Sequence, residues 1–245
     1  MYKLIAFDLD DTLSPAKNPA DSEMIGLLSQ LLEKYKVAII TGGKFETIDY
    51  QIISQIENKE VLNNLFIFPT IGTRMYYYEN GDWKLRYSHD LDDVEVEKIS
   101  LVLGKAIADL NLQPDQVWGE IVENRGSQVT YSALGQQAPL EVKRIWDPDK
   151  KIRQEIYNYI KNDLDGFTVG IAGTTSIDIT KKGLDKAYGI DMMIENLHVK
   201  KEEILFMGDA LFPGGNDFPV MEAGVTCRQV TNPEDTKKII IELLD

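Results

Sequence analysis

Residues 1–14 read MYKLIAFDLDDTLS, an apolar run that ends in closely spaced acids. The run Tyr2–Phe7, broken only by Lys3, has the composition of a strand buried in a parallel sheet. Asp8 and Asp10 are separated by one residue, so they project to the same side if the strand continues. Close carboxylates repel unless a cation offsets their charge, and Mg²⁺ prefers oxygen ligands. The stretch therefore predicts a metal site that can present a phosphate to a carboxylate. An acidic turn that caps a helix is the alternative.

The composition excludes several classes of protein. The 245 residues are 43% hydrophobic and 27% charged, as in a soluble globular protein with one large or two smaller domains. The net charge of −14 argues against a nucleic-acid-binding surface but leaves phosphate substrates open, because a metal can reverse the local field. A lone Cys227 permits no internal disulfide. Neither a membrane span nor a signal peptide is recognisable, so we expect a cytoplasmic protein that binds no membrane.

Two parts with alternating strands and helices flank a central segment with a different pattern. The flanking parts predict strands over 2–7, 37–40, 65–68, 203–207 and 225–230, helices over 21–35, 45–56, 183–197, 218–223 and 235–244, and a hairpin over 72–87. The central part predicts helices over 90–110 and 150–164 and strands over 117–122, 128–132, 167–171 and 176–179. We therefore expect an α/β fold, with a Rossmann-like parallel-sheet core (1–87 and 183–245) and an inserted α+β domain (88–182).

Polar residues follow several of the predicted parallel strands. Thr41–Gly43 come between a strand and a helix, a position that suits anion binding, although an ordinary strand-to-helix turn is the alternative. Asp209 ends another strand, and Asn216 and Asp217 lie in the loop that follows. Ligands bind beyond the carboxyl ends of parallel strands, so these groups converge if the strands are neighbours. Together with Lys186, at the start of a helix, they suit phosphoryl transfer.

These motifs resemble those of the haloacid dehalogenase (HAD) superfamily of phosphotransferases, in the branch with a large type IIB cap. The match consists of Phe7–Leu13, Thr41–Gly43, Lys186 and the stretch 208–217, in this order along the core. The resemblance implies that 88–182 is the cap and sets substrate specificity. Asp11 departs from the family pattern, which usually has glycine there, and we interpret it as a turn residue.

The resemblance implies a role for each matched core residue. Asp8 would be the nucleophile that forms an aspartyl-phosphate, and Asp10 the general acid and then the general base. Thr41 and Lys186 would hold the phosphoryl group. The Mg²⁺ ligands would be Asp8, the main-chain carbonyl of Asp10 and Asp209, with Asp217 either completing the metal shell or orienting the lysine. Substrate contacts would come from Gly42, Gly43 and Asn216, and Asn216 could also orient the lysine.

A narrower resemblance, to the eukaryote-type phosphomannomutases and Cof-like sugar phosphatases, covers the cap. It is carried by the stretches 124–127, 134–136, 176–178 and 183–186 and by the loop 213–217. It implies that the cap residues Arg125, Lys143, Ser176 and Asp178 bind substrate. From the residues alone, Arg125 could instead be an exposed hairpin charge, Lys143 a surface residue, and Ser176 and Asp178 solvated edge residues.

The cap also distinguishes two activities. The mutases hold a distal phosphate with three cap arginines, whose places are taken here by Arg125, Gln136 and, roughly, Lys143. Glutamine has no charge and lysine lacks the bidentate fork of arginine, so the grip is weaker. We therefore expect a Mg²⁺-dependent phosphatase of a small phosphorylated metabolite such as a sugar phosphate, with a phosphomannomutase as the alternative. A non-catalytic sensor would have no use for the nucleophile. The oligomeric state stays open between a monomer and a cap-mediated homodimer.

Overall fold

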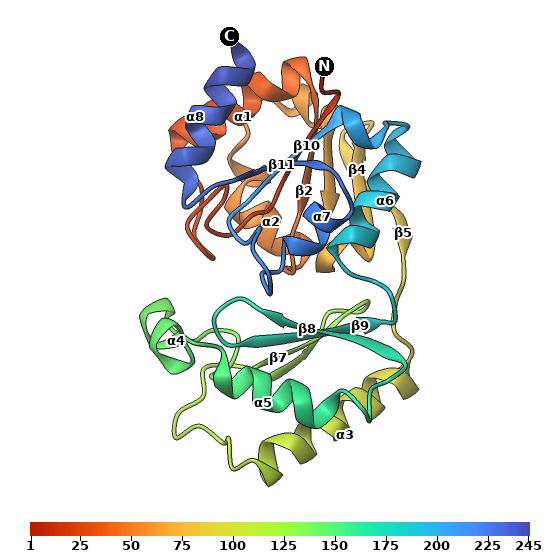
Figure 1. Ribbon diagram of the computed structural model, residues 1–245. Coiled ribbons are helices and arrows are strands. Elements are labelled where there is room, and N and C mark those ends of the chain that lie inside the picture. The colour runs from red at the N-terminus through yellow and green to blue at the C-terminus, as the bar shows by residue number, and fades with distance from the viewer. The chain divides into compact units, whose positions relative to one another are not determined.

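The computed structural model describes all 245 residues and divides into two compact units. Unit 1 consists of Met1–Ser88 and Asp185–Asp245, and unit 2 of His89–Leu184. Unit 2 is thus an insertion between the two segments of unit 1, and each unit has a hydrophobic core of its own. The colour ramp in Figure 1 shows both ends of the chain in unit 1 and the middle of the chain in unit 2.

Unit 1 is built on a seven-stranded sheet with the order β11-β10-β1-β2-β3-β4-β5. Its strands are β1 (Leu4–Phe7), β2 (Lys36–Ile40), β3 (Leu65–Phe68), β4 (Arg74–Glu79), β5 (Asp82–Ser88), β10 (Ile204–Gly208) and β11 (Thr226–Gln229). The neighbours from β11 to β3 pair in parallel, whereas β4 and β5 form an antiparallel hairpin at one edge. Because β1 lies inside the sheet with both faces covered, all of its residues are buried and apolar.

Helices cover both faces of this sheet. Residues of α1 (Ser22–Lys34), α2 (Phe45–Gln51) and α8 (Pro233–Leu244) pack in the core on one face, with Ile5 and Phe7 of β1. Residues of α6 (Lys186–Leu197) and α7 (Phe218–Glu222) pack on the other face, with the alternate β1 residues Leu4 and Ala6. The period of two along β1 thus assigns its even-numbered side chains to the face of α6.

Unit 2 contains a four-stranded antiparallel sheet with the order β6-β7-β9-β8. Its elements are β6 (Val122–Asn124), β7 (Val129–Ser132), β8 (Phe167–Ala172), β9 (Ser176–Lys181), α3 (Asp93–Asp109), α4 (Leu140–Trp146) and α5 (Lys151–Ile160). Apolar residues of β7 and β9, such as Tyr131 and Ile177, pack against α3 and α5. The alternate residues on the other face are polar, and there Thr130 donates a hydrogen bond to the Asp178 carboxylate at 2.8 Å.

The α/β fold class, with one mainly parallel and one antiparallel sheet, is confirmed. Several details of the prediction differ from the structure. The strand predicted over 117–122 begins only at Val122, because Trp118 and Ile121 are bound in a loop to Leu134 and Ser132. The second helix ends at Gln51 instead of residue 56, because the next residue, Ile52, has non-helical backbone angles. Helix α4 was not predicted.

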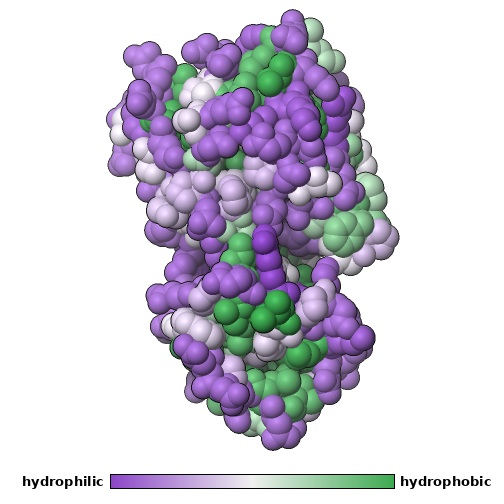
Figure 2. Space-filling model, turned by 90° about the vertical axis from the view of Figure 1, so that its left-hand side faces the viewer, coloured by the Kyte–Doolittle hydropathy of each residue, from purple (hydrophilic) through white to green (hydrophobic).

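No helix in the structure combines the length and the apolar character that a membrane crossing requires. The face of the molecule in Figure 2 is mainly hydrophilic, with separate hydrophobic areas. This surface agrees with the net charge of −14.

Candidate active site

Asp8 and Lys186 form a buried ion pair at the carboxyl end of β1. The N–H of Asp8 donates to the carbonyl of Met207 at 2.9 Å, so the ladder between β1 and β10 continues past Phe7. As an even-numbered residue, Asp8 points to the face of α6, and Lys186 is the first residue of that helix. The Lys186 Nζ donates to Asp8 Oδ1 at 2.6 Å, with both side chains less than 5% exposed. The predicted nucleophile and the predicted phosphate-holding lysine are thus in direct contact.

Asp217 is the second carboxylate bound to this lysine. Its Oδ1 accepts from Lys186 Nζ at 2.5 Å, and its Oδ2 accepts from the N–H of Ala210 at 3.1 Å. A Cβ on residue 208 would lie only 2.4 Å from Asp217 Oδ2. The glycine at the end of β10 therefore makes room for the buried carboxylate, which gives the Gly208-Asp209 motif a steric reason.

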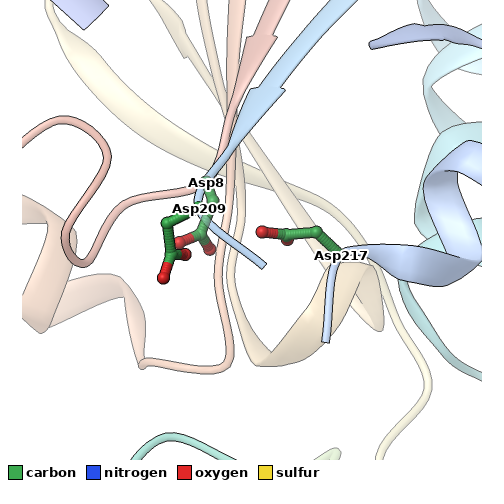
Figure 3. A group of neighbouring side chains, drawn as sticks. All are labelled: Asp8, Asp209 and Asp217. Atoms are coloured by element: carbon green, nitrogen blue, oxygen red, sulfur yellow. The ribbon is translucent and has the colours of Figure 1, made fainter. Parts of the chain in front are cut away.

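Asp8, Asp209 and Asp217 form a group of three carboxylates. Oxygen atoms of the three lie within 4.8 Å of one another, and Figure 3 shows their side chains converging from the ends of β1 and β10 and from the start of α7. They have one ammonium group, that of Lys186, to offset three negative charges. The group therefore retains an excess of negative charge.

The pKa values report this excess. Burial raises the pKa of Asp8 well above its ordinary value; the Lys186 ammonium opposes the shift and the Asp217 carboxylate adds to it. Burial and the charge of Asp217 likewise raise the pKa of Asp209 to about 6. Burial alone would lower the pKa of Lys186, but the two carboxylates outweigh it and hold that pKa above its ordinary value. A hard divalent cation would relieve the repulsion, and three carboxylates are the donors that it prefers.

The Asp10 side chain does not join this group. Its Oδ1 accepts from the main-chain N–H of Lys17 at 2.8 Å and from Gln51 Nε2 at 3.1 Å. The carboxylate is therefore held by the loop after β1 and by the end of α2. The adjacent Asp11 has a φ of 57°, and its carboxylate accepts from the N–H of Ala16 at 3.2 Å, which agrees with a turn residue.

Thr41–Gly43, at the end of β2, are held by a left-handed turn at Thr70–Gly72. The N–H of Ile71 donates to the Thr41 carbonyl at 2.8 Å, and the N–H of Thr70 to the Gly43 carbonyl at 2.9 Å. Thr70 and Ile71 have φ values of 49° and 57°, which are unfavourable for β-branched residues. Within the tip, Gly43 donates its N–H to Thr41 Oγ1 at 3.2 Å, so this hydroxyl directs its own proton elsewhere. Gly42 and Gly43 are half-buried, as is Asn216 beside Asp217.

Arg125 and Lys143, two of the predicted cap residues, are connected through Gln136. Arg125 Nε pairs with Glu123 Oε2 at 2.7 Å, and its Nη2 donates to Gln136 Oε1 at 3.1 Å. Lys143 Nζ donates to the main-chain carbonyl of Gln136 at 2.9 Å. The places of the three family arginines are thus brought together here. They hold two positive charges, one of them paired with Glu123.

Burial in the structure bears on the alternatives to substrate binding that the sequence left open for these residues. Lys143 is 3% exposed, so the surface reading is wrong, and the side chain of Arg125 is only 11% exposed, so it is not an exposed hairpin charge. Ser176 and Asp178 belong to β9, which lies inside its sheet and not at an edge. Ser176 is half-buried and Asp178 is buried, so the reading as solvated edge residues is wrong.

Sequence reasoning missed one polar residue at the core site, Gln51. It lies on the same face of α2 as Ile48 and next to Ile52, and all three are fully buried. A glutamine on the apolar face of a short helix was the signal that could have found it.

Comparisons with known proteins cover nearly the whole chain. A family model described as "Eukaryotic phosphomannomutase" matches residues 24–245. The phosphomannomutase of Schizosaccharomyces pombe is 26% identical over 243 residues, which cover 95% of this chain and 91% of the relative. The phosphomannomutase of Galdieria sulphuraria is 28% identical over 246 residues, which cover 96% and 92%.

Solved structures share the fold at lower sequence identity. A haloacid dehalogenase-like hydrolase from Bacteroides thetaiotaomicron matches with a TM-score of 0.64 at 17% identity, over 99% of this chain and all of that one. An IMP-nucleotidase of Plasmodium falciparum, solved with IMP bound, matches with a TM-score of 0.71 at 18% identity, over 99% of this chain and 68% of that one. At these identities the likeness concerns the fold alone.

Proposed function

Because the chain belongs to the eukaryotic phosphomannomutase family, we propose that it transfers a phosphoryl group between two positions of a hexose phosphate, by way of an aspartyl-phosphate on Asp8. The membership in the HAD superfamily and the likeness to the phosphomannomutases that the motifs predicted are confirmed. The relatives favour the mutase, our alternative, over the phosphatase that we expected from the cap. The observation that carries the proposal is the buried contact of Asp8 with Lys186.

The core residues divide the chemistry between them. Asp8 attacks the phosphorus atom, and Asp10 gives a proton to the sugar oxygen that leaves. Lys186 and the Thr41 hydroxyl hold the phosphoryl oxygens, and the contact of Lys186 with Asp217 keeps the ammonium charged and in place. Asp8, Asp209 and Asp217 would hold Mg²⁺, which supplies positive charge for the phosphoryl oxygens. In the second half of the reaction, Asp10 takes a proton from the incoming hydroxyl.

The cap cluster supports a second candidate, the phosphatase. A mutase must hold the bisphosphate intermediate by its distal phosphate while the other end reacts. Gln136 carries no charge, and Arg125 is already paired with Glu123 at 2.7 Å. A weak distal grip lets the intermediate escape or lets water accept the phosphoryl group. We therefore expect phosphate release to accompany sugar phosphate interconversion.

One assay separates the two functions. Purified protein with Mg²⁺ is given mannose 1-phosphate, with and without a hexose bisphosphate activator, and both mannose 6-phosphate and inorganic phosphate are measured. Interconversion that depends on the activator supports the mutase, and phosphate release alone supports the phosphatase. Turnover of neither kind would contradict the proposal.

Two pairs of variants assign the residues in this assay. Asp8→Asn should abolish both products, whereas the matched Asp11→Asn, three residues away at the turn, should keep both. Gln136→Arg should increase the ratio of mannose 6-phosphate to inorganic phosphate, because it adds a charge beside Arg125. The exposed neighbour Gln137→Arg is the control for added charge and should leave the ratio unchanged.

A further inference from the structure

Gln51 is a polar residue in an apolar position. It is fully buried at the end of α2, on the helix face that packs into the core of unit 1. Its Oε1 has no hydrogen-bond partner, and burying an unpaired polar atom is unfavourable. Leucine or methionine would fill the same space without that cost. The reason for a glutamine must therefore lie in what its Nε2 binds.

The Nε2 group of Gln51 binds two residues of the loop that follows β1. It donates to Asp10 Oδ1 at 3.1 Å and to Ser14 Oγ at 2.7 Å. The main-chain N–H of Lys17 donates to the same Asp10 Oδ1 at 2.8 Å. Both hydrogen bonds to the carboxylate thus fall on Oδ1 and none on Oδ2. This arrangement fixes the rotation of the carboxylate and leaves Oδ2 as the oxygen that can carry a proton.

We propose that Gln51 is a positioning residue for Asp10, holding Oδ1 so that Oδ2 delivers the proton to the leaving oxygen. This inference rests on the proposed function, in which Asp10 is the general acid. In the step concerned, the bond between phosphorus and the sugar oxygen breaks, and a bond between phosphorus and Asp8 forms. The sugar oxygen takes the proton from Asp10 Oδ2, which is left as a carboxylate. Without Gln51, Asp10 keeps one donor, Lys17, and can rotate about the bond to its carboxyl group.

The need for a general acid depends on the leaving group, and this gives a test that a merely structural role would not pass. Mannose 6-phosphate releases an alkoxide and needs the proton, whereas 4-nitrophenyl phosphate releases a stable phenolate and does not. We measure the rate at which each leaving group departs in a single turnover, in the wild type and in Gln51→Met. Methionine keeps the length of the side chain but removes the donor. General acids contribute about 10²- to 10⁴-fold, so the mannose 6-phosphate rate should fall by at least about tenfold.

The ratio of the two rates is the decisive quantity, because it does not depend on how much of the variant is folded. In Gln51→Met, the rate with 4-nitrophenyl phosphate should stay within about twofold of the wild type, so the ratio shifts by at least about fivefold. Gln51→Asn, which keeps the amide but is one methylene shorter, should shift the ratio in the same direction. Gln55→Met is the matched control, since Gln55 donates to the main-chain carbonyl of Gln51 at 2.6 Å and does not reach Asp10. Its ratio should equal that of the wild type.

Asp10→Asn separates failure of this inference from failure of the proposed function. If Asp10→Asn shifts the ratio and Gln51→Met does not, the inference is wrong and the proposed role of Asp10 stands. If both rates fall equally in Gln51→Met, the residue is only structural and the inference is again wrong. If the wild type turns over neither substrate, or Asp10→Asn leaves the ratio unchanged, the proposed function itself fails.

Discussion

Adding Mg²⁺ should stabilise the folded protein more at pH 7.5 than at pH 5, because of the carboxylates around Lys186. The pKa of Asp209 is about 6 in the folded chain, compared with an ordinary value of 3.8. A raised pKa in the folded state means that this residue favours folding below pH 3.8, and that the contribution is lost as the pH rises through about 6. Mg²⁺ restores it by neutralising the charged carboxylate. Asp8, whose pKa is also raised, acts in the same direction.

The magnitude follows from the titration of Asp209. The full shift of the Asp209 pKa, from 3.8 to about 6, corresponds to at most about 3 kcal/mol of folding free energy. Measurements at pH 5 and pH 7.5, both above the sequence pI of 4.6, sample only part of this shift. One pH unit below its pKa, a carboxylate must lose its proton before it binds a metal, which weakens binding about tenfold, or about 1.4 kcal/mol. Solvent screening reduces this value to about 1 kcal/mol, since Asp209 is only partly buried. A protein of this size shifts its melting temperature by about 2 to 4 °C for 1 kcal/mol.

The assay is thermal unfolding with excess Mg²⁺ and with EDTA, at both pH values. The gain in melting temperature from Mg²⁺ should be about 2 to 4 °C larger at pH 7.5 than at pH 5. Asp209→Asn should reduce both the gain and its pH dependence, because an amide does not titrate and binds the metal less well. An equal gain at both pH values, or a larger gain at pH 5, would refute the reasoning about the carboxylate group.

Three substitutions test other parts of the structure. Lys186→Met should inactivate the protein and lower its free energy of unfolding by about 3 to 5 kcal/mol, because two buried carboxylates lose their cation. Denaturant titrations without metal measure this, and an unchanged midpoint would contradict it. Gly72→Ala should lower the free energy of unfolding by about 1 to 3 kcal/mol and reduce kcat, because the new Cβ would lie 2.6 Å from the Cα of Gly189 on α6. A wild-type kcat would show that the turn does not position the site. Arg153→Met should lower the free energy of unfolding by about 3 to 5 kcal/mol, because it leaves Asp147 buried without its partner. Adding Asp147→Leu should recover part of this free energy. No recovery would mean that packing, and not charge, dominates.

The parallel sheet and the core motifs could be predicted because their signals are local. β1, β2 and β10 are short buried runs that are mostly apolar, and Asp8, Thr41 and Asp209, which follow them directly, mark their carboxyl ends. The strand at β6 could not be predicted in the same way, since Val117–Ile121 are apolar enough for a strand but are bound in a loop to residues near Leu134. Helix α4 has only seven residues, and Pro139, which precedes it, gives no side-chain cap, so neither periodicity nor capping marks it.

The polar contacts across the site depend on tertiary structure and could be predicted only in part. The likeness to a family pointed to Lys186 and Asp217, but no pattern in the sequence indicates that both bonds of Lys186 would be made in a fully buried position. Lysine is usually a surface residue, and only the fold shows that the Lys143 ammonium group reaches the Gln136 carbonyl. Gln51 and Asp10 are 41 residues apart in the chain, and the periodicity of a single sequence gives no information about contacts at that separation.

The central place of β1 has a consequence for the synthesis of the protein. β1 pairs with β10, so Leu4 can pair with Ile204 only after about 200 more residues have been synthesised. At roughly 5 to 20 residues per second, the ribosome needs about 10 to 40 s to deliver that partner. During this interval β1 has an open edge inside an unfinished sheet, and such edges invite aggregation. Unit 2 is continuous in sequence and all of it precedes β10, so we expect the growing chain to be most prone to aggregation while unit 1 still lacks β10 and β11.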